Sequence, residues 1–74
     1  MDYLDRITYS SEIFNGKPII RNMRIRVQDV LDMLASGMSE KEILDDFPYL
    51  ESEDIRACLQ YAALKISHPV IHAA

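Results

Sequence analysis

The sequence predicts a mainly α fold, in which a β-ribbon at residues 1–26 precedes three helices at residues 27–67 and a tail at residues 68–74. Three observations predict it. Apolar residues recur about every second position in residues 21–27, which is typical of strands, and every third or fourth position from Val27 on, which is typical of helices. Gly37 and Pro48 then divide the helical part into three. A chain of 74 residues has room for a single domain.

The N-terminal part has the composition of short strands joined by turns. Residues 7–9 and 19–20 are rich in β-branched and aromatic types, and Asn15 with Gly16 is a strong turn signal between them. In residues 21–27 apolar and polar types nearly alternate, so we expect one apolar and one cationic face. The apolar face holds Met23, Ile25 and Val27, and the cationic face holds Arg24 and Arg26.

The first two predicted helices have clear stripes and ends. The first stripe, at positions i, i+3, i+4 and i+7, consists of Val27, Val30, Leu31 and Leu34. Gly37 can adopt the left-handed conformation that ends a helix. Ser39 and Glu42 have capping-box spacing at the start of the second helix, which Pro48 ends. Its apolar side holds Ile43, Leu44 and Phe47.

The third predicted helix starts near residue 51 or 52, with Glu53 and Asp54 in its first turn, where the helix dipole favours acids. Its predicted apolar stripe consists of Ile55, Leu59, Ala62 and Ile66, with Cys58 and Ala63 alongside. Residues 67–69 end it. The second and third helices are separated by a short turn, which is a helix-turn-helix pattern that any small helical bundle can also produce.

Composition narrows the function classes. Cys58 is the single cysteine, so no intrachain disulfide can form, and this fits a reducing cytoplasm. The apolar runs are too short to span a membrane. His68 and His72 are separated by Pro69, which disfavours a metal site, and no glycine-rich phosphate loop is present. We therefore expect no enzyme activity, no metal and no cofactor, and a homodimer or a protein partner that adds to a small core.

Charge is unevenly distributed along the chain, whose formal net charge is -4. Residues 17–26 hold four of the eight cations and no acid. Residues 29–54 hold nine acids and one lysine, which gives a local charge of -8. The sequence therefore predicts a basic arm followed by an acidic body.

Two sets of candidate binding residues follow from this distribution. The set for nucleic acid consists of Lys17, Arg21, Arg24, Arg26 and Arg56. The set for a protein partner consists of Asp45, Asp46, Tyr49, Val70 and Ile71. The cations have two simpler interpretations: they solvate an exposed strand edge, or they pair with Asp45 and Asp46 of the same or a second chain. The acidic first turn of the third helix disfavours ordinary insertion into a DNA groove.

The chain resembles the bacterial family called domain of unknown function 433 over residues 6–64. The opening of the family pattern is matched by Gly16, Pro18, Ile20, Arg21, Arg24, Ile25 and Val27. Its central part is matched by Leu34, Gly37, Ser39, Glu42, Ile43, Leu44, Phe47, Pro48 and Leu50, and its last helix by Glu53, Asp54, Ile55, Ala57, Ala62 and Ala63. Asn22 stands where the family usually has a glycine, at a turn.

This resemblance implies a homeodomain-like three-helix fold with an N-terminal β element. It also implies an antitoxin that neutralises a PIN-like nuclease by binding it and that represses its own operon through DNA contact. Two other functions stay open: a DNA-binding regulator without a toxin, and a dimerising interaction module.

Overall fold

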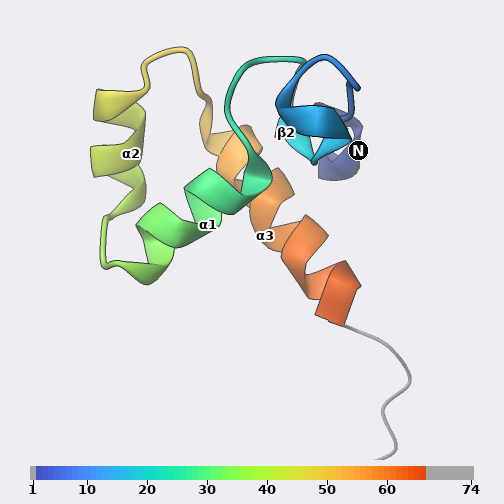
Figure 1. Ribbon diagram of the computed structural model, residues 1–74. Helices are drawn as coiled ribbons and strands as arrows, with labels where there is room; N and C mark the ends of the chain where they lie inside the picture. Colours follow the sequence, from blue (N-terminus) through green and yellow to red (C-terminus); the bar gives the residue numbers. More distant parts are fainter. Residues whose placement is uncertain (1, 67–74) are drawn as a thin grey trace, which may run out of the picture.

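The computed structural model describes residues 2–66 and has three helices beside a small N-terminal sheet (Figure 1). The helices are α1 (Val27–Ala35), α2 (Glu40–Asp46) and α3 (Ser52–Ile66). The strands β1 (Ile7–Thr8) and β2 (Ile19–Ile20) pair antiparallel, with Ile7 opposite Ile20. Two short 3₁₀ turns, η1 (Tyr3–Arg6) and η2 (Phe14–Gly16), complete the N-terminal part. The predicted mainly α fold with an N-terminal ribbon is confirmed.

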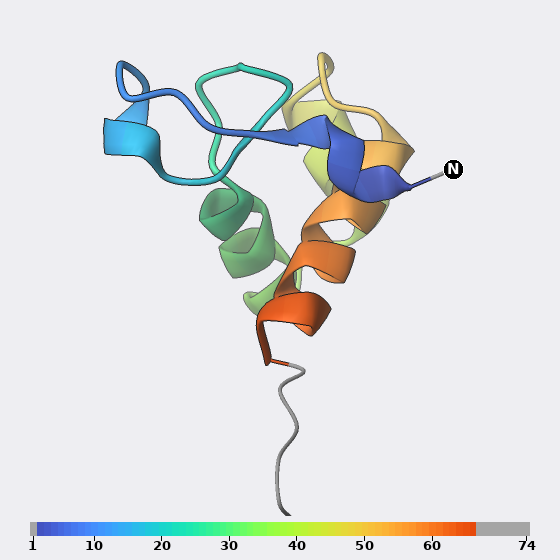
Figure 2. The same cartoon turned by 90° about the vertical axis from the view of Figure 1, so that its right-hand side faces the viewer.

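The N-terminal part packs on the bundle: η1 lies against α3, the longest helix, and β1 touches the same helix. Figure 2 shows the strands crossing above α1 and α3, with α2 behind them. The N-terminal part is therefore packed against the helices and does not project from the domain as the predicted arm would. None of the helices in residues 2–66 has the length and apolarity needed to cross a membrane.

Residues 21–24 form a tight turn, so the prediction of one extended segment over residues 21–27 is wrong there. Arg21 and Asn22 both have positive φ, 45° and 58°, and the Met23 amide donates to the Ile20 carbonyl at 2.8 Å. Two positive φ values in succession are typical of a type I′ turn, which returns the chain antiparallel to itself. Ile25 therefore lies beside Ile20, and the left-handed conformation expected of a family glycine is adopted by Asn22. The predicted alternation of burial holds, because Ile25 is buried and Arg24 is exposed.

Local signals set the ends of α1 and α2 as predicted. Gly37 has φ 103°, and the Ser39 hydroxyl accepts from the Glu42 amide while the Glu42 carboxylate accepts from the Ser39 amide. The resulting core joins the sheet to all three helices. It consists of Ile7, Ile20, Ile25, Val27, Val30, Ile43, Leu50, Ile55, Ala57 and Cys58.

The predicted apolar stripe of α3 is wrong for Leu59 and Ile66, whereas Ala62 is half-buried. Leu59 is 49% exposed and Ile66 is 72% exposed, whereas Ile55 and Cys58 are buried and Tyr61 packs against the core. The reason is that α3 packs the side with Ile55, Cys58 and Tyr61 on the core, and Leu59 lies on another side of the helix.

Candidate functional site

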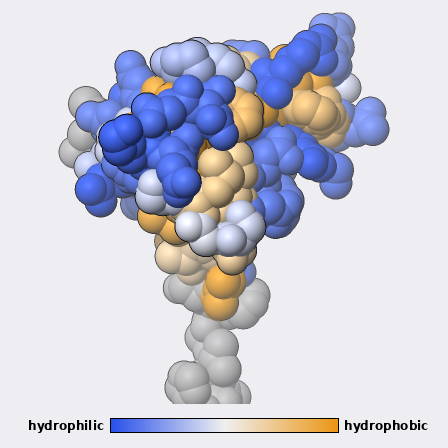
Figure 3. All heavy atoms as spheres, turned by 90° about the vertical axis from the view of Figure 1, so that its left-hand side faces the viewer, coloured by the Kyte–Doolittle hydropathy of each residue, from blue (hydrophilic) through white to orange (hydrophobic). Residues whose placement is uncertain are grey.

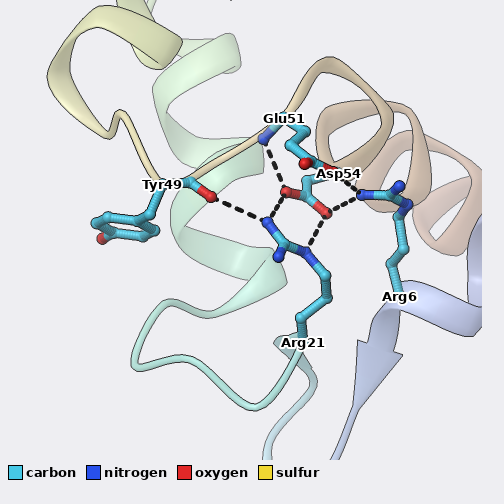
Figure 4. A network of polar contacts seen from close by, with 5 residues as sticks. All are labelled: Arg6, Arg21, Tyr49, Glu51 and Asp54. Atoms are coloured by element: carbon cyan, nitrogen blue, oxygen red, sulfur yellow. Dashed lines mark hydrogen bonds and ion pairs between the residues drawn. The ribbon is translucent and has the colours of Figure 1, made fainter.

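A buried carboxylate organises the surface around the α2–α3 turn (Figure 4). The Asp54 side chain is fully buried. Its Oδ1 accepts from Arg6 Nη1 at 2.9 Å and from Arg21 Nε at 3.0 Å. Its Oδ2 accepts from Arg21 Nη2 at 2.7 Å and from the Glu51 amide at 2.8 Å. Asp54 thus joins η1, the β2–α1 turn and the start of α3.

The outer parts of this network fix the turn before α3. Arg21 Nη2 also donates to the Tyr49 carbonyl at 2.9 Å, and Arg6 Nη1 donates to Glu51 Oε1 at 2.7 Å. Burial disfavours the charged form of Asp54, but the bonds from Arg21, the Glu51 amide and Arg6 outweigh it and lower the pKa of Asp54. The carboxylate is therefore charged and fully hydrogen-bonded, which is the condition under which a buried charge is tolerated.

The structure gives two of the candidate nucleic-acid ligands partners within the chain. Arg21 binds Asp54, as described, and Arg26 pairs with Asp29 at 2.6 Å across the first turn of α1. The Arg26 guanidinium also lies over the Phe14 ring, 5.4 Å from its centroid. An intermolecular contact is therefore not needed to explain why these two arginines lie in the basic segment, although their binding to nucleic acid stays a prediction.

Lys17, Arg24 and Arg56 differ from these two arginines, because all three are exposed and form no ion pair within residues 2–66. They come from the segment before β2, the turn before α1 and the outer side of α3. Their side chains are accessible to a ligand.

The predicted pairing of the basic segment with α2 of the same chain is wrong for the described residues, and its pairing with Asp45 and Asp46 of a second chain stays a prediction. Asp45 pairs with Lys41 of its own helix at 2.9 Å, and both side chains are well exposed. Asp46 is exposed and forms no ion pair among the described residues. Arg26 pairs instead with Asp29, three residues further along the chain, and Arg21, in the tight turn, pairs with Asp54 at the start of α3.

The other predicted partner residues have different positions. Tyr49 lies in the α2–α3 turn with 49% of its surface exposed, and its ring packs edge-to-face on Phe47 at 6.1 Å. Val70 and Ile71 lie outside the described residues, as do His68 and His72. Cys58 is buried as predicted, and burial together with Asp54 raises the pKa of its thiol to about 12. No group of metal-ligating side chains large enough to hold an ion occurs in residues 2–66.

Sequence reasoning missed Arg6 and the buried position of Asp54. A partial signal exists for Asp54, because a carboxylate three residues after Glu51 can reach back to the amide of that residue. Nothing local signals Arg6, which lies 48 residues from Asp54.

Comparison with known proteins places the chain in a family. A family model described as "Protein of unknown function (DUF433)" matches residues 7–62. The chain belongs to the DUF433 family. The matched region of this DUF433 chain includes Arg21, Tyr49 and Asp54, and Arg6 lies just before it.

Two relatives illustrate this membership. "Uncharacterized protein y4eO" of Sinorhizobium fredii (strain NBRC 101917 / NGR234) is 38% identical over 56 residues, which are 76% of this chain and 25% of that protein. The crystal structure of a DUF433 member protein from Anabaena variabilis ATCC 29413 has a TM-score of 0.77 and 30% identity, and the match covers 82% of this chain and 60% of that one. The chain thus spans a quarter of the first relative and three fifths of the second.

Proposed function

We propose that this DUF433 protein is an antitoxin of the cytoplasm that neutralises a PIN-like nuclease by binding it in a stoichiometric complex. The nuclease would be blocked by occlusion, and the protein would catalyse no reaction of its own. The family resemblance supports this function class, and the surface around the α2–α3 turn supports the mechanism.

The observation that carries the proposal is an acidic surface, which we call the α2 face. Its exposed carboxylates belong to Glu42, Asp45, Asp46, Glu51 and Glu53. Figure 3, viewed from the side on which α2 lies, shows hydrophilic residues over much of the upper part of the molecule. A nuclease that grips RNA needs a positive cleft, and opposite charges on two surfaces speed and select their association. Tyr49 adds an exposed aromatic ring beside these acids, a type often found at the centre of interfaces.

The Asp54 network supports the same mechanism. Arg21 holds the Tyr49 carbonyl, and Asp54 holds the Glu51 amide, so the turn between α2 and α3 is fixed at both ends. A surface that is ordered before binding loses less conformational entropy when the complex forms. The order of this turn supports the proposal that the α2 face binds the nuclease without a change of shape.

Coexpression with the adjacent open reading frame tests the proposal. We expect a stable complex by size-exclusion chromatography with light scattering, and loss of ribonuclease activity at equimolar ratio. Asp46→Lys should weaken the complex at least tenfold, because it reverses an exposed charge on the α2 face. Glu12→Lys is the matched control, since it makes the same charge change on an exposed residue of the N-terminal part. A harmless neighbour, or equal losses from both variants, would refute the mechanism.

A second candidate function, binding to operator DNA, is favoured by the exposed Lys17, Arg24 and Arg56. Phosphate contacts supply most nonspecific affinity for DNA, and unpaired cations are available for them without breaking an internal ion pair. Binding to promoter DNA should then weaken with salt, and Arg24→Ala should reduce the salt slope by about one. Binding that does not depend on salt would contradict this candidate.

A further inference from the structure

Helix α3 has a second apolar side that the monomer covers only in part. Its members lie at positions i, i+3, i+4 and i+7, and we call them the outer stripe: Leu59, Ala62, Ala63 and Ile66. Leu59 is 49% exposed, Ile66 is 72% exposed, and Ala63 is exposed as well. A helix that is apolar on two sides is usually covered on both.

The outer stripe extends into a hollow. A cavity of about 370 Å³ lies between α1 and α3, with Val27 and Leu31 on the α1 side and Ala62 and Ile66 on the α3 side. Figure 1 shows the last turns of α3 reaching beyond the other helices, and Figure 3 shows hydrophobic residues down to the point where the described chain ends. Ala62 and Ile66 thus connect the stripe to the hollow, whose lining also includes Lys17, Arg26 and Lys65.

We propose that a second copy of this chain covers the outer stripe, with the two α3 helices antiparallel. The order along the stripe is large, small, small, large. A twofold axis between Ala62 and Ala63 therefore places Leu59 opposite Ile66 of the second copy and the two small residues opposite each other. Small residues at the centre let helix axes approach to about 8 Å, and the large ones then fill the spaces on either side. Such an interface is isologous, as in most dimers.

Charge favours the same arrangement. After Asp54, α3 carries Arg56 and Lys65 and no acid. Antiparallel pairing places Lys65 opposite Gln60 of the second copy, so no like charges face each other across the centre. Parallel pairing would place each cation beside its own counterpart, which repels, and would also align the two helix dipoles unfavourably. The outer stripe shares no residue with the α2 face, so the dimer and the proposed nuclease complex can be tested separately.

The size of the surface sets the expected strength. A stable interface buries about 800 Å² on each partner. The molecule exposes 5217 Å² in total. The outer stripe is about 10 Å long, and it supplies only part of the roughly 800 Å² that a stable interface buries on each partner. We therefore expect a dimer that dissociates on dilution in the micromolar range.

Sedimentation equilibrium of the full chain across about a hundredfold range of concentration tests the surface. Leu59→Lys and Ile66→Lys should each raise the dissociation constant at least tenfold, because each buries a charge where a large apolar side chain fills the interface beside its centre. Leu64→Lys is the matched control, since Leu64 is 55% exposed on the same helix but outside the stripe. It should change the constant less than threefold. A monomeric wild-type chain, or an equal effect of the control, would overturn the proposal, and circular dichroism confirms that each variant is folded.

Disulfide cross-linking tests the direction of the helices. Across the proposed axis, Ala63 lies about 1.5 Å along the helix from its counterpart, whereas Leu59 lies about 10 Å from its own. A disulfide joins Cα atoms about 4.4–6.8 Å apart, so Ala63→Cys should cross-link under oxidation and Leu59→Cys should not. Equal cross-linking of both would indicate parallel helices and overturn the proposal. The native Cys58 is buried and should not react.

These outcomes are separate from those of the nuclease test. A chain that binds a nuclease as a monomer overturns the dimer and leaves the antitoxin proposal intact. A dimer that binds no nuclease overturns the antitoxin proposal and leaves the dimer proposal intact.

Discussion

Replacement of Asp54 by asparagine tests the role of the buried network most directly. The variant keeps the shape of the side chain and removes its charge. An amide presents one oxygen and one NH₂ group, whereas the carboxylate presents two accepting oxygens. If NH₂ replaces Oδ2, it faces Arg21 Nη2 and the Glu51 amide; if it replaces Oδ1, it faces Arg6 and Arg21 Nε. Either orientation loses two hydrogen bonds and brings donors against donors.

The expected magnitude follows from these two bonds. A hydrogen bond to a charged group contributes about 1.5–3 kcal/mol. The sum must be reduced, because the side chains of Arg6 and Arg21 are 26% and 36% exposed and can turn to water once Asp54 is neutral. We expect the free energy of unfolding to fall by about 2–4 kcal/mol. A domain of this size is stable by only about 4–11 kcal/mol, so the loss would be a large fraction of the total.

Urea unfolding followed by circular dichroism measures the change, since the chain has no tryptophan. Because the network lowers the pKa of Asp54, its contribution is fully present above the unfolded pKa and is lost as pH falls through the folded pKa. The wild-type advantage over Asp54→Asn should therefore be constant above about pH 5 and shrink below about pH 4.

The control for Asp54→Asn is a variant of the exposed residue Asp46, unfolded in urea at the same protein concentration. Asp46→Asn makes the same chemical change on the surface of α2 and should alter stability by less than about 0.5 kcal/mol. An Asp54→Asn variant as stable as this control would refute the reasoning, and so would a wild-type advantage that does not change with pH.

Three further predictions concern local features. Ser39→Ala removes the hydroxyl that caps α2 and should cost about 1 kcal/mol in urea unfolding, whereas Ser11→Ala, on an exposed turn, should cost almost nothing. Gly37→Ala should destabilise by about 1 kcal/mol at constant m-value; no atom lies within 4 Å of an added Cβ, so a larger loss would show that strain from φ 103° is not the main cause. The Cys58 thiol, whose pKa burial raises to about 12, should react with a disulfide reagent at neutral pH only at the rate of unfolding, and rapid labelling of the folded chain would contradict its burial.

The features that the sequence predicted correctly depend on neighbouring residues. The Ser39–Glu42 capping box spans three residues, and Gly37 ends α1 through its own φ. Each of these signals depends only on residues a few positions apart in the sequence, so the end of α1 and the start of α2 are as expected. The capping acid of α1, Asp29, also lies three residues from its partner Arg26.

The features that the sequence did not predict depend on distant residues. Leu59 and Cys58 are adjacent apolar residues on α3, and only the position of α1 and η1 decides which of them is buried. The partners of Asp54 are likewise supplied by segments that precede the helices. The sequence alone does not distinguish Arg21 from Lys17 and Arg24, which are exposed. Arg21 differs because it lies in the type I′ turn, which directs its side chain to Asp54.

The sequence distance within the Asp54 network bears on the order of folding and on the lifetime of the folded chain. Arg21 is 33 residues from Asp54 and Arg6 is 48, so both ion pairs close long loops, whereas the helix caps close almost none. We expect the caps and α1–α2 contacts to form first and the N-terminal segment to dock last. Interactions that form after the folding barrier mainly slow unfolding. Asp54 would then determine chiefly how long the domain stays folded once it has formed, and have little influence on how quickly it reaches that state.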